Sequence, residues 1–122
     1  MGFTWNLWQT VGLLFIVTSA ASGQAVEWLL RPQSVSVREG ENVTFECRLN
    51  IEDPNLIWSR DSSGSGNTSI LFLKSERFDA SSRVSTINRY DLFITNVKKE
   101  DNGVYACRTK DAGIQTASLT VL

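Results

Sequence analysis

The sequence predicts an all-β domain of short antiparallel strands closed by one disulfide. The segment Asn42–Cys47 alternates strictly between polar and apolar residues, which is typical of a strand with one buried and one solvated face. Other short apolar runs are separated by turn-forming residues, and no stretch after residue 23 shows a helical period. Two cysteines, Cys47 and Cys107, lie far apart in the sequence.

Residues 1–23 have the features of a signal peptide. They contain no charged side chain, and their apolar centre, Val11–Val17, is far shorter than the roughly 20 residues that span a bilayer. Ala21 and Gly23 fit the small −3 and −1 positions of a cleavage site, which predicts cutting before Gln24. Because the usual basic residues are missing, a short buried helix or an uncleaved anchor is the alternative.

We expect residues 24–122 to form one exported domain. The net charge of −1 argues against nucleic acid, which binds basic surfaces, and no polybasic patch favours a membrane surface. The mature chain has no apolar segment long enough to insert into a membrane. The expected location is extracellular: secreted as written, or at the cell surface if the chain is part of a longer receptor.

In an exported chain of this size, two cysteines most simply form a disulfide, here between Cys47 and Cys107. In the chain-entropy model, closing such a loop adds about 4 kcal/mol of stability as an upper value. The alternative is a pair of free buried thiols, which requires a reducing compartment.

Several further segments predict strands that bury one face. Val35 and Val37 alternate with polar residues. The residues expected inward are Leu56 and Trp58; Leu92 and Ile94; and Ala117, Leu119 and Val121. The run Ile70–Leu73 is apolar throughout, so about half of it must face outward. Exposed apolar surface of this kind indicates a contact with another molecule.

Seven residues in order resemble the signature of the immunoglobulin superfamily: Cys47, Trp58, Leu92, Asp101, Gly103, Tyr105 and Cys107. The resemblance extends over essentially all of residues 24–122. Room between Trp58 and Arg83 for extra edge strands is similar to the variable (V-set or I-set-like) type. The resemblance implies an immunoglobulin-like two-sheet Greek-key sandwich, with the disulfide joining the two sheets.

The same resemblance implies a structural role for each signature residue. Trp58 packs over the disulfide, and Tyr105 forms a tyrosine corner in which its hydroxyl bonds to backbone upstream. Arg83 pairs with Asp101, and a partly buried pair is worth more than the 0–1 kcal/mol of a surface pair. Gly103 allows a tight turn before the strand of Tyr105. We assign these residues to the architecture and not to function.

A narrower resemblance involves both ends of the domain. Trp28–Gln33, Tyr90–Ile94 and Lys110–Leu122 are similar to the first domain of the irregular-chiasm and nephrin-like adhesion receptors, which bind one another through their first-domain sheets. Arg108 departs from the glutamine that often follows the second cysteine in that family. The IgLON-like neuronal adhesion domains are the alternative. A missing Phe-Gly-X-Gly motif disfavours an antigen-receptor variable domain.

The sequence predicts no catalytic, cofactor or metal site. It has no histidine, which excludes Ser-His-Asp and Cys-His catalysis and histidine-based metal sites. The loop carboxylates of Glu39, Glu41, Asp53 and Asp61 lack the spacing of an EF-hand. We therefore expect a protein that is not an enzyme and needs no cofactor.

Two N-glycosylation sites are predicted, at Asn42 in Asn-Val-Thr and at Asn67 in Asn-Thr-Ser. The alternative is a chance occurrence of each motif. Asn42 lies at an outward strand position. Asn67 lies in the polar loop Asp61–Ser69, where a glycan would limit the approach of a partner to strands C and C′.

A partner-binding surface is predicted on the sheet face formed by strands G, F, C and C′. Strand alternation and the apolar C′ run select its candidate residues: Ile57, Ser59, Phe72 and Arg108, with Ala106 beside them. An apolar strip with an arginine at its centre is typical of a protein contact. The alternative is that the Asp61–Ser69 loop covers Ile57 and the C′ run.

These features predict a protein-recognition module of cell–cell adhesion. The expected partner is another immunoglobulin-like cell-surface protein or a second copy of this chain, bound sheet to sheet. The first alternative is a soluble immune-type domain that binds a foreign ligand through its loops. The second is a structural fragment of a longer chain, which sequencing of the transcript past Leu122 would reveal.

Overall fold

The computed structural model describes residues 25–62 and 66–122. The predicted signal peptide, residues 1–23, lies outside the described residues and stays a prediction. No helix in the described part is long and apolar enough to cross a membrane. Its elements are β1 (Trp28–Leu30), β2 (Val35–Val37), β3 (Val43–Phe45), β4 (Arg48–Leu49), β5 (Ile57–Asp61), β6 (Thr68–Leu73), β7 (Glu76–Arg77), β8 (Val84–Ile87), β9 (Asp91–Ile94), the 3-10 helix η2 (Lys99–Asp101), β10 (Gly103–Arg108) and β11 (Ile114–Val121).

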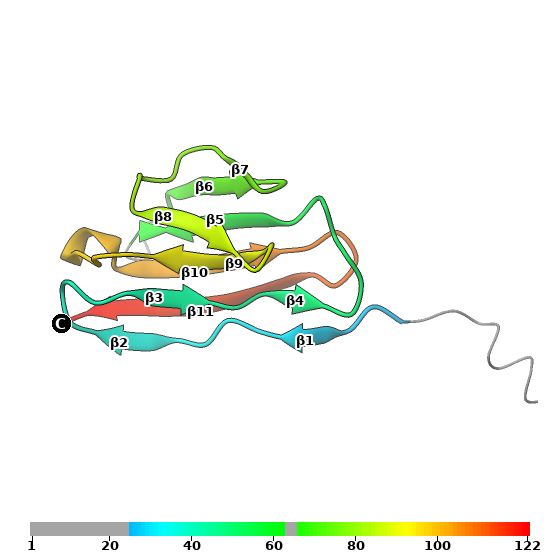
Figure 1. The fold of residues 1–122 in the computed structure, drawn as a ribbon, viewed down its shortest axis with the longest axis horizontal. Helices are drawn as coiled ribbons and strands as arrows, with labels where there is room; N and C mark the ends of the chain where they lie inside the picture. Colours follow the sequence, from blue (N-terminus) through cyan, green and yellow to red (C-terminus); the bar gives the residue numbers. More distant parts are fainter. Residues whose placement is uncertain (1–24, 63–65) are drawn as a thin grey trace, which may run out of the picture.

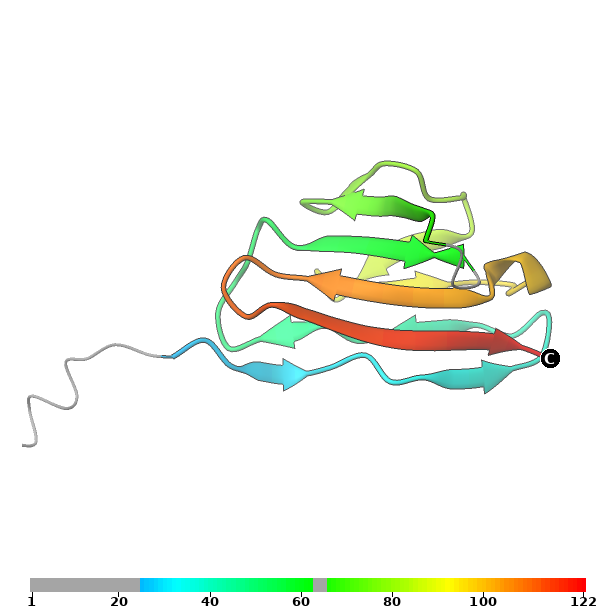
Figure 2. The same ribbon diagram turned by 180° about the vertical axis from the view of Figure 1, so that it is seen from behind.

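The strands form two layers, which confirms the predicted immunoglobulin-like sandwich (Figure 1). One layer is the six-stranded sheet β2-β11-β10-β5-β6-β7, which faces the viewer in Figure 2. The other consists of β3-β9-β8, together with the short pair β1-β4, in which β4 lies in line with β3 and β1 in line with β2 (Figure 1). Strand β2 runs parallel to β11, and the other pairs are antiparallel. Strands β6 and β7, beside β5, are the additional strands of a variable-type domain.

The core lies between the two layers and follows the predicted alternation. In β3, Val43 and Phe45 are buried while Thr44 is exposed. In β11, the buried residues are Ala117, Leu119 and Val121, and the residues between them face solvent. The other residues expected inward are buried as well: Leu56 just before β5, Trp58 on β5, and Leu92 and Ile94 on β9.

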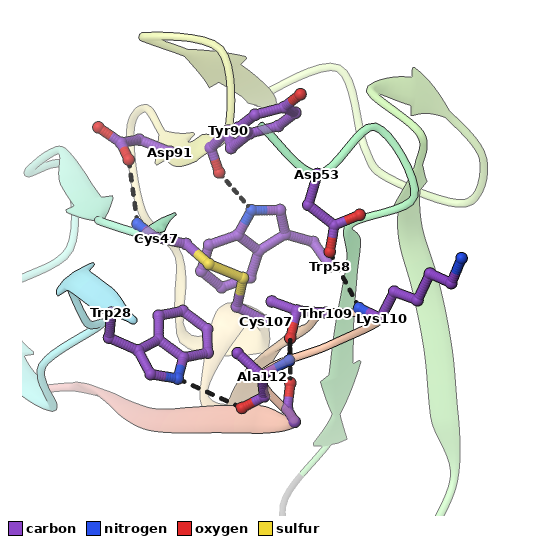
Figure 3. The surroundings of a disulfide bond; sticks show 11 residues. Trp28, Cys47, Asp53, Trp58, Tyr90, Asp91, Cys107, Thr109, Lys110 and Ala112 are labelled. Carbon is purple, nitrogen blue, oxygen red and sulfur yellow. Dashed lines mark hydrogen bonds between the residues drawn. A yellow bond between two sulfur atoms is a disulfide. The ribbon is translucent and has the colours of Figure 1, made fainter. Parts of the chain in front are cut away.

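A disulfide links the two layers between Cys47, which follows β3, and Cys107 on β10. Their Cα atoms are 6.6 Å apart. Trp58 lies directly opposite Cys107 in the sheet, and Figure 3 shows its indole beside the disulfide. The indole Nε1–H donates a hydrogen bond of 2.6 Å to the carbonyl of Tyr90, so the polar atom of this buried ring is paired.

Asp91 is a buried residue that the sequence pattern does not single out. The residue is 0% exposed, although it stands beside the inward residue Leu92, where alternation predicts an outward side chain. The carboxylate accepts a hydrogen bond of 3.0 Å from the backbone N–H of Cys47 (Figure 3). It accepts a second one, of 3.1 Å, from the Arg48 guanidinium. Cys47 lies between β3 and β4, where strand pairing is interrupted. The Asp91 carboxylate thus takes the place of the backbone carbonyl that a paired strand would offer to this N–H.

The turn before β10 contains the tyrosine corner. The Tyr105 hydroxyl donates a hydrogen bond of 2.7 Å to the carbonyl of Asp101, and its ring stacks on Phe45 at 5.2 Å between centroids. Burial raises the pKa of the Tyr105 hydroxyl to about 12, so it stays protonated and able to donate at neutral pH.

The Asp101 carboxylate holds this turn against β8. It accepts two hydrogen bonds from the Arg83 guanidinium, at 2.7 and 2.9 Å, and one from the backbone N–H of Lys98 at 2.7 Å. Burial by itself would raise the pKa of Asp101, but the hydrogen bonds from Arg83 and Lys98 and the nearby positive charge outweigh it and lower the pKa. The hydrogen bond to Asp101 raises the pKa of Arg83 in turn.

We predict that Asp101→Asn lowers the free energy of unfolding by roughly 3 kcal/mol at pH 7, because Arg83 then loses its charged partner. A carboxyl with a lowered folded pKa stabilises the fold above its unfolded pKa of about 3.9, and this contribution disappears as pH falls through the folded pKa. The difference between the two proteins should therefore be full above pH 5 and shrink at more acidic pH. Urea unfolding between pH 2 and 7 measures it, and a pH-independent difference would contradict the prediction.

Candidate functional site

The outer face of four neighbouring strands forms a regular grid of side chains. We call it the GFCC′ face, after the strands β11 (G), β10 (F), β5 (C) and β6 (C′) of a variable-type domain. Residues directly opposite one another in a sheet share a face. The pairing places three rows on it: Leu73, Ile57, Arg108 and Ile114; Ile70, Ser59, Ala106 and Thr116; and Thr68, Asp61, Val104 and Ser118.

Half of this grid is apolar. Ile114 and Val104 are 45% and 36% exposed, and both are among the large hydrophobic residues that the fold leaves at the surface. Ile57, Ile70 and Leu73 are half-buried on the same face. The sequence placed Ile57 and part of the run Ile70–Leu73 here, but which residues of that run face outward depends on the register between β5 and β6. Val104 and Ile114 were not singled out, although alternation with the inward residues Tyr105 and Ala117 places them on this face.

A shallow hollow of about 320 Å³ opens on this face. Its lining residues are Ile57, Ser59, Thr68, Ile70 and Arg108. Arg108 is exposed, whereas Ser59 is only 5% exposed. Of the predicted contact residues, the structure thus brings Ile57, Ser59 and Arg108 together at one hollow. Ser59 offers a partner little surface, which corrects its assignment as a main contact residue.

Phe72, also predicted as a contact residue, is 4% exposed and belongs to the core. The reason is a shift in the pairing of β5 with β6 between Trp58 and Ser59. Phe72 lies opposite the inward residue Trp58, and Ile70 lies opposite the outward residue Ser59. The extra residue between them, Leu71, is buried too. The residues of the apolar run that face outward are therefore its two ends, Ile70 and Leu73. The assignment of Phe72 to the partner surface is wrong.

The predicted glycosylation residues lie on different parts of the molecule. Asn42 is exposed just before β3, on the three-stranded layer. Asn67 is exposed just before β6, next to Thr68 at the edge of the hollow on the GFCC′ face. Attachment of a glycan to either residue remains a prediction.

A larger hollow of about 450 Å³ lies at the end of the sandwich where β4 and the β8–β9 turn meet. It is lined in part by Arg48 and Arg89, but each of these has a carboxylate partner, Asp91 and Glu52 respectively. The arginines are therefore already neutralised and give the hollow little net positive charge. Within residues 25–62 and 66–122, no three His, Cys, Asp or Glu side chains are grouped so as to hold a metal ion.

Comparison with known proteins agrees with this architecture. The family model described as immunoglobulin domain matches residues 27–110. T cell receptor alpha variable 17 of Homo sapiens is 33% identical over 84 residues, which are 64% of this chain and 75% of that protein. The chain is similar to this receptor segment although it lacks the Phe-Gly-X-Gly motif of strand G in antigen receptors.

Two much longer proteins are also similar. Protein sidekick of Drosophila melanogaster is 28% identical over 109 residues, or 80% of this chain and 4% of sidekick. Roundabout homolog 1 of Mus musculus is 34% identical over 83 residues, or 67% of this chain and 5% of its own length. The chain thus spans a small part of these relatives. With the two-layer fold, the inter-sheet disulfide and the additional β6 and β7 strands, the match shows that the chain belongs to the immunoglobulin superfamily, as a domain of the variable or intermediate type.

Proposed function

We propose that this domain is an extracellular protein-recognition module in cell–cell adhesion, which docks through its GFCC′ face onto a second immunoglobulin domain and performs no catalysis. The observation that supports this proposal best is the grid of apolar and small side chains around Arg108 on a rigid sheet. Exposed apolar surface gathered on one face marks protein contacts. A face of four strands is large enough for the roughly 800 Å² that each partner buries in a standard interface.

The charges on the GFCC′ face favour a second copy of the chain as the partner. Arg108 and Asp61 lie in the two outer rows, about 13 Å apart along the strands, and the central row, which contains Ile70 and Ala106, lies between them. In a two-fold symmetric contact, if one residue of the first copy meets a second residue of the other copy, the same two residues also meet with the copies exchanged. An antiparallel arrangement would set Arg108 of each copy against Asp61 of the other, so that both ion pairs form and the central row of each copy meets the same row of the other.

We predict that Ile57→Asp abolishes self-association, because it places a charge in the apolar hollow that a partner has to fill. Sedimentation velocity of the exported protein measures the loss, and circular dichroism checks that the fold persists. Leu29→Asp is the matched control, since Leu29 is an exposed leucine on β1 and lies outside the GFCC′ face. Normal association of the Ile57 variant, or equal loss in the control, would place the contact elsewhere.

A charge exchange tests the self-docking arrangement. Arg108→Glu and Asp61→Lys should each weaken self-association at least about tenfold, because each sets like charges opposite one another. An equimolar mixture of the two variants should associate as well as the original protein, since the mixed dimer keeps one Arg108–Asp61 pair unchanged and forms the other pair with reversed sign. A mixture that associates no better than either variant alone would argue against the two-fold contact.

The likeness to a T cell receptor variable segment favours a second candidate, a soluble immune-type domain that binds a foreign ligand through its loops. In variable domains the loops at one end of the sandwich, including the one between strands F and G, form that site. Here this loop contains Lys110 and Asp111, both exposed. If Lys110→Ala and Asp111→Ala abolish ligand capture while Ile57→Asp does not, the loops and not the sheet form the binding site.

A further inference from the structure

We propose that Asn42 carries an N-linked glycan whose innermost sugar covers the ring of Phe93 on the outer face of the β3-β9-β8 sheet. The site would take an N-acetylglucosamine-based glycan. The inference rests on the proposed extracellular function in one respect, because the modification requires that the chain enter the secretory pathway. It does not depend on what the GFCC′ face binds.

The folded domain has room for a sugar at Asn42. Both Asn42 and the hydroxyl residue of its motif, Thr44, are exposed, and they point to the same side of an extended segment. The Asn42 side-chain oxygen accepts a hydrogen bond of 3.1 Å from the backbone N–H of Asn96. Glycosylation uses the amide nitrogen, so it leaves this hydrogen bond intact and the bond orients the linkage.

Phe93 provides an apolar surface beside this position. It lies directly opposite Thr44 on one side and Ser85 on the other, and these small side chains leave its ring half-exposed. Asn42 is two residues from Thr44, which makes it a diagonal neighbour of Phe93 at roughly 7–8 Å. The first sugar of an N-linked glycan extends over this distance, and its C–H groups would remove the ring from water.

The consequence concerns which sheet is open to a partner. A glycan at Asn42 would occupy the outer side of the three-stranded layer, whereas the GFCC′ face lies on the opposite layer. The modification would therefore leave the six-stranded sheet as the accessible face of the sandwich.

Two substitutions at Thr44 separate the glycan from other effects. The full chain is expressed in animal cells as Thr44→Ser, which keeps the hydroxyl that glycosylation requires, and as Thr44→Ala, which does not. We expect peptide mass spectrometry to find the glycan at Asn42 in the serine variant alone, and its Tm to be higher by roughly 4 °C. Protein from the medium and from the cells is analysed, so that failed export and failed modification give different results.

Phe93→Thr tests the contact between sugar and ring. This substitution replaces the aromatic ring by a β-branched residue, which also favours strands, and leaves the glycosylation motif unchanged. When Phe93→Thr is combined with each Thr44 variant, the Tm difference between the Thr44→Ser and Thr44→Ala proteins should disappear. The glycan should still be found at Asn42 in the protein with Thr44→Ser. An unmodified Asn42 in the serine variant overturns the site, and a Tm difference that persists without Phe93 overturns the contact. Neither outcome affects the docking assays on the GFCC′ face.

Discussion

The pairing of β5 with β10 is the constraint on which both the core and the surface depend. In this register Trp58 lies opposite Cys107, and both are buried between the layers. Side chains in a strand alternate with a period of two, so the neighbouring pair, Ile57 and Arg108, has to face solvent. A slip of β5 by one residue would expose Trp58 and turn Ile57 into the core. The packing that makes the disulfide region stable is therefore the same packing that presents the proposed contact residues.

Buried carboxylates complete the fold where strand pairing stops. Asp91 accepts the backbone N–H of Cys47 at the interruption between β3 and β4. Asp53 is also buried, and it accepts the backbone N–H of Lys110 from the loop that follows β10. Like Asp101 in the turn before β10, each links a backbone donor to a distant part of the chain. An unpaired N–H in the interior is costly, so these side chains substitute for the missing strand partners.

The two outer faces of the sandwich differ in chemistry. The GFCC′ face combines leucine, isoleucine and valine side chains with small residues, one arginine and one aspartate. On the three-stranded layer, hydroxyl side chains surround a half-exposed Phe93 next to a glycosylation motif. Both faces belong to strands whose inward residues are fixed by the core, so their outward residues are free to differ without changing the fold. Such a division suits a domain that recognises a partner through one sheet while the other is shielded.

The sequence by itself determined the all-β class, the pairing of Cys47 with Cys107 and the inward faces of β3 and β11, because these follow from alternation and from two cysteines in one domain. Only the tertiary structure decided which residues of the run Ile70–Leu73 face outward. A shift in the pairing of β5 with β6 inserts one residue, and this turns Phe72 toward Trp58 and into the core. Likewise, the burial of Asp91 depends on a backbone donor 44 positions away. Register and long-range hydrogen bonding arise between segments, and a local pattern of residue types does not contain them.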